Sequence, residues 1–549
     1  MSLVVSLAGI CAIGLLTAGL VFSDRINDTQ WLLALGVAWL LMLVVTRTAL
    51  PIRFPTFNRT LIRTAMVIAT VFIVISAQLV RIQIVASDAT FNRTAVAPDG
   101  EIMGNPRLAT TELSMRRGEI FDRHGIAIAE TEQQGDIYVR TWPDPSTAYV
   151  AGYYSPLLYG SAGLEASWNT ELTGDSGNDP LERVINDLLN RPQQGADLRL
   201  TLDSALQRQA MNLLGGSTGS VVVMDVETGE VLVFASNPNF DPNQLFTPTT
   251  AANDAATMYW QSLVENPSAP LVLRSNLGLF TPGSTFKTVT SAIGIELGVI
   301  EPDDVYEDNG QITIDGRMLV ENNRPDETRD LWTVREAVAW SLNVVFAQIG
   351  LDIGADDFWS AGQDVGFGQQ IPFDLPVAES QLASGREYLD SDNALADTAF
   401  GQGELLVTPL FMCMLTSMYV NDGEMMQPYL VDQVVDENGK VTQSTHSQVW
   451  NSPISSQAAS EVEEMMIGAV NNGSVGRAQI NGYTVGGKTG TAETGDGSAH
   501  SWFIGFIGNE QPRYAVAVVL EGGSGGLVSA VTIGRDILYG AIIAPAPSD

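Results

Sequence analysis

A serine and a lysine three residues apart are the first candidates for chemistry in this sequence. In Thr281-Pro-Gly-Ser-Thr-Phe-Lys287, a Pro-Gly pair precedes an apolar-rich run from Phe286 to Val299, which predicts a buried helix. Ser284 then lies at or near the helix N-terminus, with Lys287 one turn later on the same face. Such a pair can act as nucleophile and base without a histidine. Alone, the pattern is common, and a capped, solvated first turn is its usual explanation.

Lysine is scarce in this chain, which makes its positions informative. The 549 residues contain three lysines, Lys287, Lys440 and Lys488, and arginine supplies the other 25 of the 28 basic side chains. Arginine stays protonated in a protein, whereas a buried lysine can lose its proton. Because two of the three lysines stand in motifs with serine or threonine, we expect these two to serve chemistry.

Three different polar clusters follow one another along the chain. They are Ser284-x-x-Lys287, Ser341-Leu-Asn343 and Lys488-Thr-Gly490. Taken singly, the second is an ordinary helix end and the third an ordinary exposed turn. Taken together, with two of the three lysines, these structural explanations become improbable and a shared active site is the better hypothesis.

The elements that must hold these clusters predict an α+β fold. A hairpin is expected from Ser220–Asp225 and Val231–Ala235, and Thr333-Val-Arg-Glu336 has the pattern of a helix capping box. Further strands are expected around 483–491, 501–507 and 514–520, and helices at 204–214, 409–419 and 528–542. Strands at both ends of this region with helices between them predict an antiparallel sheet covered by helices.

Three hydrophobic stretches open the chain, at residues 3–22, 31–45 and 61–80. We expect residues 1–80 to form a transmembrane region with three helices. The loop between the second and third stretches carries Arg47, Arg53 and Arg59, so the positive-inside rule places it in the cytoplasm and everything after residue 80 outside. A cleaved signal peptide is the alternative, but no basic segment precedes the first apolar run.

The remainder divides into a smaller and a larger part. Residues 81–195 contain short alternating runs, a hairpin turn at Asp122–Gly125 and a helix expected at Asp179–Leu189. This predicts a small, mostly β pedestal domain outside the membrane. Residues 196–549 hold the three polar clusters and are expected to form one catalytic domain.

Composition excludes several classes of function. The net charge is −35, so we expect no binding of nucleic acid or anionic lipid surfaces. The two cysteines, Cys11 and Cys413, stand in apolar runs, and the three histidines show no ligand spacing. We therefore expect no disulfide framework, no metal site and no other cofactor.

The combined motifs resemble those of penicillin-binding proteins and serine β-lactamases. Further stretches resemble class B penicillin-binding proteins in particular: Arg117–Gly125 (RGEIFDRHG), Ala235–Asn243 (ASNPNFDPN) and Lys488–Glu493 (KTGTAE). The segments Gly152-Tyr-Tyr-Ser and Gly163-Leu-Glu165 are closest to the penicillin-binding protein A branch. The resemblance covers about residues 110–545. Two departures are the three expected membrane helices, where the family usually has one, and His124 in place of a frequent asparagine.

The resemblance implies peptidoglycan D,D-transpeptidation on a five-stranded antiparallel sheet covered by helices. Ser284 would be the nucleophile and Lys287 its base, because burial beside Lys488 should lower the lysine pKa. Ser341 would relay a proton to the leaving nitrogen, and Asn343 would bind the substrate backbone. Lys488, Thr489 and Thr491 would face the substrate carboxylate, while Gly490 would leave the sheet edge free for substrate. The backbone N–H groups of Ser284 and Thr491 would form the oxyanion hole.

The resemblance also implies partners. Stem peptides ending in D-Ala-D-Ala would be donors, an amine of a neighbouring stem the acceptor, and β-lactam antibiotics would acylate the serine. Glycan polymerisation would come from a separate polytopic membrane glycosyltransferase, for a role in cell shape or cell division. The alternatives are a non-catalytic scaffold of the wall-building complex and a membrane-bound β-lactamase-like hydrolase. The 147-residue interval from Ser341 to Lys488, with the anchor and pedestal, favours the transpeptidase.

Overall fold

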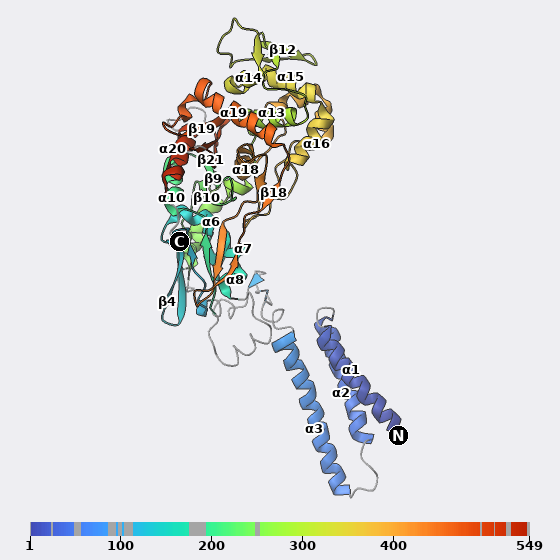
Figure 1. Cartoon of the computed structure of the whole chain (residues 1–549). Helices are drawn as coiled ribbons and strands as arrows, with labels where there is room; N and C mark the ends of the chain where they lie inside the picture. The colour runs from blue at the N-terminus through green and yellow to red at the C-terminus, as the bar shows by residue number, and fades with distance from the viewer. Residues whose placement is uncertain are drawn as a thin grey trace. The chain divides into compact units, whose positions relative to one another are not determined.

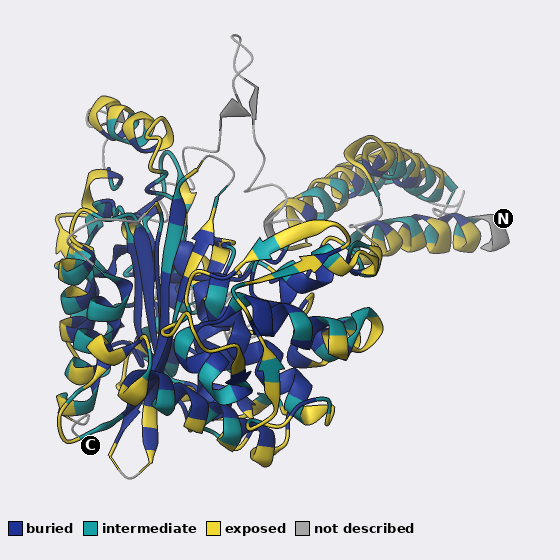
Figure 2. Cartoon of the chain, turned by 90° about the horizontal axis from the view of Figure 1, so that it is seen from above, coloured by how far each residue is buried: buried dark blue, intermediate teal, exposed yellow. Residues whose placement is uncertain are grey.

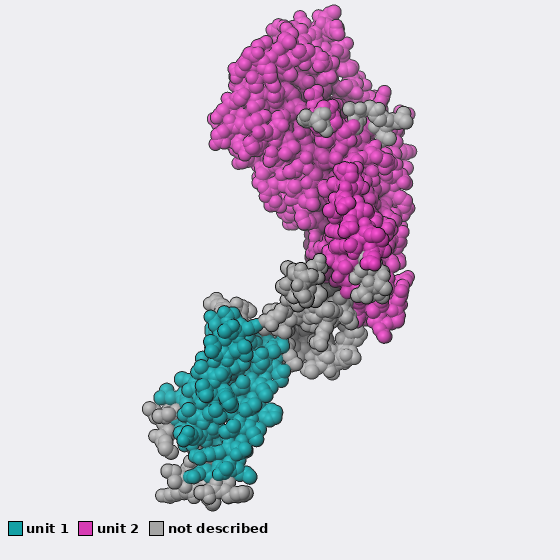
Figure 3. All heavy atoms as spheres, turned by 180° about the vertical axis from the view of Figure 1, so that it is seen from behind, with its two compact units in different colours: residues 1–112 teal, residues 113–549 magenta. Residues whose placement is uncertain are grey.

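The computed structural model of the chain forms two compact units, residues 1–112 and 113–549 (Figure 1; Figure 3). It describes residues 2–22, 26–48, 56–85, 95–96, 102–103, 113–174, 194–247, 253–494, 497–509, 511–522 and 529–545. The helix expected at Asp179–Leu189 lies outside these ranges. The predicted boundaries at residues 80 and 195 stay predictions.

The first unit contains the three expected hydrophobic helices. They are α1 (Ser2–Val21), α2 (Asp28–Thr48) and α3 (Thr56–Val80), and α3 runs on into the short η2 (Arg81–Val85). Two described segments, Asp28–Thr48 and Arg59–Val80, are long and apolar enough to cross a membrane, and the apolar segment Val5–Val21 is shorter. The second stretch is thus a 21-residue helix, longer than its 31–45 hydrophobic run indicated. The three-span topology stays a prediction.

A five-stranded antiparallel sheet forms the centre of the second unit, as predicted. Its order is β10-β9-β21-β20-β19. The strands are β9 (Gly219–Asp225), β10 (Val231–Asn237), β19 (Thr484–Glu493), β20 (Ala499–Gly508) and β21 (Pro512–Leu520). All four pairings are antiparallel, and β19 forms one edge of the sheet. The α+β fold class is therefore confirmed.

Helices cover both faces of this sheet, because both faces are apolar. Along β9, Val222 and Met224 belong to one buried cluster and Val221 and Val223 to another, as the two-residue period of a strand requires. Figure 2 shows the strands as dark blue ribbons between helices whose outer sides are yellow. One face packs on α18 (Pro409–Tyr419), the other on α10 (Ser204–Leu214) and α20 (Ala530–Ile543). All three helices were predicted to within a few residues.

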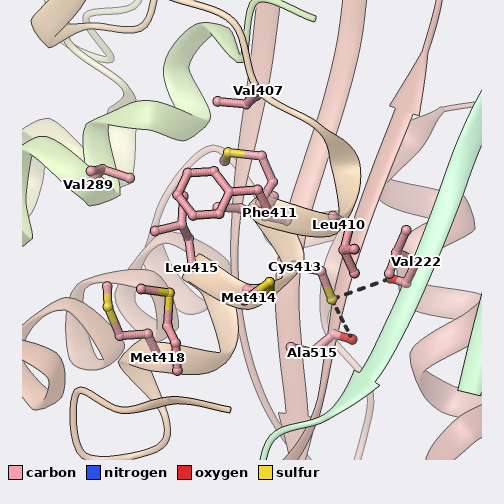
Figure 4. Close-up of a cluster of buried hydrophobic side chains, with 14 of the residues drawn as sticks. Val222, Val289, Val407, Leu410, Phe411, Cys413, Met414, Leu415, Met418 and Ala515 are labelled. Atoms are coloured by element: carbon pink, nitrogen blue, oxygen red, sulfur yellow. Dashed lines mark hydrogen bonds between the residues drawn. The ribbon is translucent and has the colours of Figure 1, made fainter. Parts of the chain in front are cut away.

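The helix α18 belongs to the larger buried core of the second unit. Each of its eleven residues is buried. Figure 4 shows Phe411, Met414 and Met418 in a cluster of buried side chains, with the Cys413 thiol directed at the carbonyl oxygens of Val222 and Ala515, at 3.7 and 3.5 Å. Burial raises the pKa of the Cys413 thiol. Cys413 is therefore a packing residue, as its apolar surroundings in the sequence predicted.

A second, six-stranded sheet builds the pedestal. Its order is β17-β16-β8-β3-β4-β5. The strands are β3 (Ile120–Phe121), β4 (Ala127–Gln134), β5 (Ile137–Thr141), β8 (Asp197–Leu200), β16 (Val431–Val435) and β17 (Val441–Ser444). The predicted turn at Asp122–Gly125 joins β3 to β4. The contribution of β16 and β17, from deep inside the predicted catalytic domain, was not foreseen.

Residues 301–400 contain more structure than the sequence predicted. The pairs β11 (Val305–Glu307) with β14 (Leu331–Thr333) and β12 (Gln311–Ile314) with β13 (Arg317–Val320) form two small sheets. Helices α14 (Val334–Trp340), α15 (Asn343–Ile353), α16 (Ala355–Val365) and α17 (Asp392–Ala399) follow. The predicted capping box is confirmed, because Thr333 and Glu336 exchange hydrogen bonds at the start of α14. These elements surround one side of the three polar clusters.

The remaining described helices and strands of the second unit lie in the pedestal and elsewhere. In the pedestal they are α6 (Ala148–Ala151), β6 (Tyr154–Ser155), β7 (Gly160–Ser161), α7 (Leu164–Ser167) and α8 (Asn169–Thr173). Elsewhere they are α11 (Asn253–Val264), α12 (Arg274–Leu277), η6 (Gly283–Phe286), α13 (Lys287–Glu296), β15 (Met425–Met426), β18 (Val449–Asn451) and α19 (Ser456–Asn472). Further short 3₁₀ turns are η3 (Pro145–Thr147), η4 (Pro242–Gln244), η7 (Arg386–Asp390) and η8 (Gly476–Ala478).

The Arg117–Gly125 motif connects the pedestal to the rest of the unit. Arg123 pairs with Glu230 at 3.3 Å, and His124 contacts the Asp203 carboxylate at 3.1 Å. Arg117 instead points inward, where it and Arg140 both bind Glu165. All three of these side chains are at least 95% buried. The motif therefore braces the fold and does not contribute to the polar clusters.

Candidate active site

The predicted nucleophile lies in a short turn that is pinned to its neighbours by glycines. Ser284 belongs to the 3₁₀ turn η6, and Lys287 is the first residue of α13. Gly283 has φ +57° and its nitrogen donates to the carbonyl of Gly401 at 2.9 Å. A Cβ on Gly401 would come within 1.8 Å of the Gly283 carbonyl oxygen. The two backbones therefore approach each other so closely that residue 401 has no room for a side chain.

The second cluster occupies the junction of two helices. Ser341 ends α14 in the left-handed conformation, with φ 66° and ψ 42°, and Asn343 begins α15. A non-glycine residue in this region is strained by about 1–2 kcal/mol, so surrounding contacts must hold it. This turn presents both the side chain and the carbonyl of Ser341 to the buried lysines.

The third cluster lies on the edge strand β19. Lys488 is fully buried, Thr489 is half-buried and Thr491 is exposed. A Cβ on Gly490 would stand 2.5 Å from the Pro282 carbonyl oxygen and 3.1 Å from the Thr285 nitrogen. The absence of a side chain at Gly490 therefore lets β19 pack against the turn that carries Ser284. This is a different reason from the substrate contact that the sequence suggested, and the substrate contact stays a prediction.

These elements line one open cleft of about 660 Å³. Five of the predicted site residues face it: Ser284, Ser341, Asn343, Thr489 and Thr491. The two lysines lie buried beneath it. The other lining residues are Leu319, Val320, Asn322, Asn323, Trp340, Asp397, Phe400, Gln402, Gly403, Ser474 and Glu493.

Both buried lysines converge on Ser341. The Lys488 ammonium donates to Ser341 Oγ at 2.8 Å and to the Thr489 carbonyl at 3.0 Å. The Lys287 ammonium donates to the Ser341 carbonyl at 2.6 Å, to Ser341 Oγ at 3.3 Å and to Asn343 Oδ1 at 2.7 Å. The Ser341 hydroxyl thus links the two lysines, which lie 201 residues apart in the sequence (488 minus 287).

Burial changes the acid–base properties of both lysines. Desolvation, followed by repulsion from Lys488, holds the pKa of Lys287 well below its ordinary value, while the Glu321 carboxylate acts in the opposite direction. Desolvation lowers the pKa of Lys488 to about 7. Because the charged form of a lysine is disfavoured in such a place, a neutral amine becomes available near physiological pH. This is the property that a lysine base requires.

The expected contact between nucleophile and base is not formed. Among the described residues, Lys287 Nζ makes no hydrogen bond to Ser284 Oγ, because its donors are directed at Ser341 and Asn343. Catalytic hydrogen bonds are often long in the absence of substrate. The same cleft nevertheless holds Ser284 one helical turn from the buried amine.

Sequence reasoning missed three polar residues at the cleft. Gln402 Nε2 donates to the Thr491 carbonyl at 3.4 Å, and Asn323 Nδ2 donates to the Ser341 carbonyl at 2.9 Å. Glu321 is 8% exposed and accepts the backbone nitrogens of residues 322, 323 and 344. No short motif marks these residues. The Gly-Gln-Gly sequence was the only available signal, for Gln402.

Comparison with known proteins identifies families that match both parts of the second unit. The family description "Penicillin binding protein transpeptidase domain" matches residues 219–539, and "Penicillin binding protein A dimerisation domain" matches residues 117–198. The chain is 29% identical over 458 residues to the peptidoglycan D,D-transpeptidase PbpA of Mycolicibacterium smegmatis, which covers 80% of this chain and 91% of that protein.

Solved structures show the same similarity. The imipenem acyl-enzyme complex of penicillin-binding protein A from M. tuberculosis has a TM-score of 0.72 and 29% identity, over 78% of this chain and 99% of that one. The D,D-transpeptidase domain of a peptidoglycan glycosyltransferase from Eggerthella lenta has a TM-score of 0.68 and 32% identity, over 78% and 98% of the two chains.

Proposed function

The chain belongs to the penicillin-binding protein transpeptidase family, and from this premise we propose that it is a serine D,D-transpeptidase that cross-links peptidoglycan stem peptides through an acyl-enzyme on Ser284. The observation that carries the proposal is the convergence of Lys287 and Lys488 on the hydroxyl of Ser341 at the base of a cleft that Ser284 lines. The acyl-enzyme complex of a relative with imipenem supports the same chemistry.

In the acylation step, Ser284 Oγ attacks the carbonyl carbon of the peptide bond in D-Ala-D-Ala. Lys287, in its neutral form, accepts the hydroxyl proton, directly or through Ser341 Oγ. The lowered pKa of Lys287 supports this role, because an ordinary lysine is almost wholly protonated at neutral pH. The product is an ester on Ser284.

Departure of the terminal D-Ala requires a proton on its nitrogen. Ser341 Oγ can supply this proton, because it accepts hydrogen bonds from both lysines and can recover a proton from either. Asn343 keeps the Lys287 amine in place at 2.7 Å and, as a cleft residue, can also bind the substrate backbone. An amine of a second stem peptide then attacks the ester, and Ser284 is regenerated.

The strand β19 supports the substrate-binding part of the proposal. It is the edge of the central sheet, so an extended peptide can add to it as a further strand. Thr489 and Thr491 face the cleft from this edge, with the charge of Lys488 behind them to attract the substrate carboxylate. The N–H groups of Ser284 and Thr491 would stabilise the oxyanion.

The cellular setting follows from the first unit. The apolar helices α2 and α3 support anchoring in the cell membrane. The arginines between their apolar stretches, Arg47, Arg53 and Arg59, support a catalytic part outside. The family description and the relatives concern transpeptidation, so we propose that a separate membrane glycosyltransferase polymerises the glycan strands. Peptidoglycan stem peptides and β-lactam antibiotics are the proposed ligands of the cleft.

Labelling with a fluorescent penicillin tests the proposal. We expect one molecule of label per folded wild-type chain and no label on Ser284→Ala, because the variant lacks the nucleophile. Thermal unfolding of both proteins provides the control for folding. A folded wild-type chain that takes no label would contradict the enzyme and support a scaffold. Rapid turnover of a chromogenic cephalosporin would instead support a β-lactamase-like hydrolase.

A further inference from the structure

The segment after strand β13 reaches into the space between the polar clusters. Its residue Glu321 follows the β12–β13 hairpin directly and is buried, although the hairpin itself is largely exposed. A buried carboxylate requires hydrogen bonds or opposite charges to compensate for its lost hydration. Glu321 has both, and they come from elements that carry site residues.

The hydrogen bonds of Glu321 join two parts of the site. Oε2 accepts the backbone nitrogen of Val344 at 3.0 Å, in the first turn of α15, whose first residue is Asn343. Oε1 accepts the backbone nitrogens of Asn322 and Asn323, each at 3.0 Å. The carboxylate therefore ties the start of α15 to the segment that carries Asn323.

Asn323 continues this connection to the buried amine. Its Nδ2 donates to the Ser341 carbonyl at 2.9 Å, and the Lys287 amine donates to the same oxygen at 2.6 Å. Since Ser341 is held in a left-handed conformation, its carbonyl orientation depends on such contacts. The contacts therefore run from Glu321 through Asn323 to the Ser341 carbonyl, and from that oxygen to Lys287.

Charge is the second contribution of Glu321. The charged groups facing Lys287 are Lys488 on β19, which repels it, and Glu321, which attracts it. Glu321 in turn faces the Asp308 carboxylate, which also lies near Arg324 and Asp330. Among these groups, Glu321 is the one whose negative charge acts directly on the buried amine.

We propose that Glu321 is a positioning residue of the acylation centre, which fixes the Ser341 carbonyl through Asn323 and supplies the negative charge that balances the paired lysines. This inference rests on the proposed function, because it concerns the base that would activate Ser284. Glu321 does not itself line the cleft, and it acts through residues that do, because it binds the backbone nitrogens of Asn322 and Asn323.

The pH dependence of acylation by fluorescent penicillin tests the inference on the full-length chain. The wild-type rate constant should rise with pH as Lys287 loses its proton. In Glu321→Gln the attracting charge is gone, so protonated Lys287 is less stable and the midpoint of this rise should move to lower pH by about one unit. A lower rate with an unchanged midpoint would overturn the inference, since a purely structural role predicts that result.

Two further variants complete the test. Glu336→Gln also removes one negative charge, at the N-terminal capping box of α14. Glutamine suits a capping box as well, so this variant should fold and leave the midpoint unchanged. Asn323→Ala keeps the Glu321 charge and should lower the rate constant about fivefold through one lost hydrogen bond, at an unchanged midpoint. An unchanged rate in Asn323→Ala overturns the positioning role, even where Glu321→Gln does not fold. A wild-type chain without label at every pH would refute the proposed function instead.

Discussion

At the scale of single residues, the site depends on two lysines whose protonated form is disfavoured by burial. Lys287 and Lys488 are both fully buried, and each shares the hydroxyl of Ser341 with the other. Two ammonium groups so close cannot both remain protonated easily, which makes one of them a base at neutral pH. Arginine could preserve the hydrogen bonds in such a place, but it could not release its proton.

Replacement of Lys287 by arginine separates charge from basicity. We expect Lys287→Arg to lower the rate of penicillin acylation by about 10²–10⁴-fold, the usual contribution of a general base. The measurement is the time course of labelling at pH 7.5, together with thermal unfolding to establish that the variant is folded.

The chain contains its own control for this substitution. Lys440 is exposed in the turn between β16 and β17, and Lys440→Arg should label at the wild-type rate. Labelling of Lys287→Arg at that same rate would show that another group serves as base.

The motif residues could be predicted from sequence for physical reasons. Ser284, Lys287 and Lys488 stood out because lysine is rare here and because a fixed spacing places a base beside a nucleophile. Glu321 and Asn323 could not be found in this way. Their role depends on hydrogen bonds across space to Val344 and Ser341, and no local pattern records such pairs.

At the scale of elements, the site exists because a strand edge and a turn pack without side chains between them. Gly490 lies against the turn of Ser284, and Gly283 lies against both Gly401 and the Thr491 carbonyl. These backbone contacts fix the distance between the nucleophile and the strand that is expected to bind substrate. A methyl group added at one of these glycines should displace the nucleophile from the strand. It should therefore affect catalysis more than the stability of the fold.

The substitution Gly490→Ala tests this packing. Its Cβ would stand 2.5 Å from the Pro282 carbonyl oxygen, so β19 and η6 must separate. We expect the acylation rate to fall about a hundredfold, as small misplacements of reacting groups do. The rate constant with fluorescent penicillin measures the effect.

Gly468→Ala is the matched control, because a Cβ at this position in α19 meets nothing within 4 Å. This variant should acylate normally and unfold at the wild-type temperature or slightly above it. Equal rates for the two alanine variants would contradict a role for the close approach.

The central sheet could be predicted from its alternating or continuous apolar strands, whereas the segment from 301 to 400, apart from the capped start of α14, could not. The helices α15 to α17 are interrupted by acidic and glycine-containing stretches that resemble loop sequence. Their stability comes from packing on the common core, in which Val345, Phe346 and Phe358 are fully buried. Such tertiary support overrides local preference.

At the scale of the whole molecule, a buried ionic cluster holds the pedestal together. Glu165 binds both Arg117 and Arg140. Burial favours the neutral acid, but the charges of Arg140 and Arg117 outweigh this effect and hold the pKa of Glu165 below its usual value. Glu165 therefore contributes stability above the ordinary glutamate pKa, and this stability is lost as pH falls through the lower, folded value.

We expect Glu165→Gln to destabilise the chain by about 3–5 kcal/mol, because two buried guanidinium groups lose their charge partner. Thermal unfolding at pH 7 measures this loss. The difference from wild type should shrink as the pH falls from the ordinary glutamate pKa through the lower, folded pKa of Glu165.

Asp356→Asn is the control, because it breaks the ion pair between Arg386 and a carboxylate that is 91% exposed. This change should cost less than about 1 kcal/mol. An equal loss of stability in both variants would show that the buried cluster has no special role.

The strand order of the six-stranded pedestal sheet limits when this sheet can form. Strand β8 lies between β3, about 80 residues upstream, and β16, more than 230 residues downstream. A chain is made from its N-terminus onward. One side of β8 therefore has no partner strand until residues 431–435 have been made. The pedestal sheet is therefore completed only after the segments of Ser284 and Ser341 have been made, and shortly before β19 to β21 complete the central sheet. A chain that ends before residue 431 thus presents neither a finished pedestal nor a complete cleft.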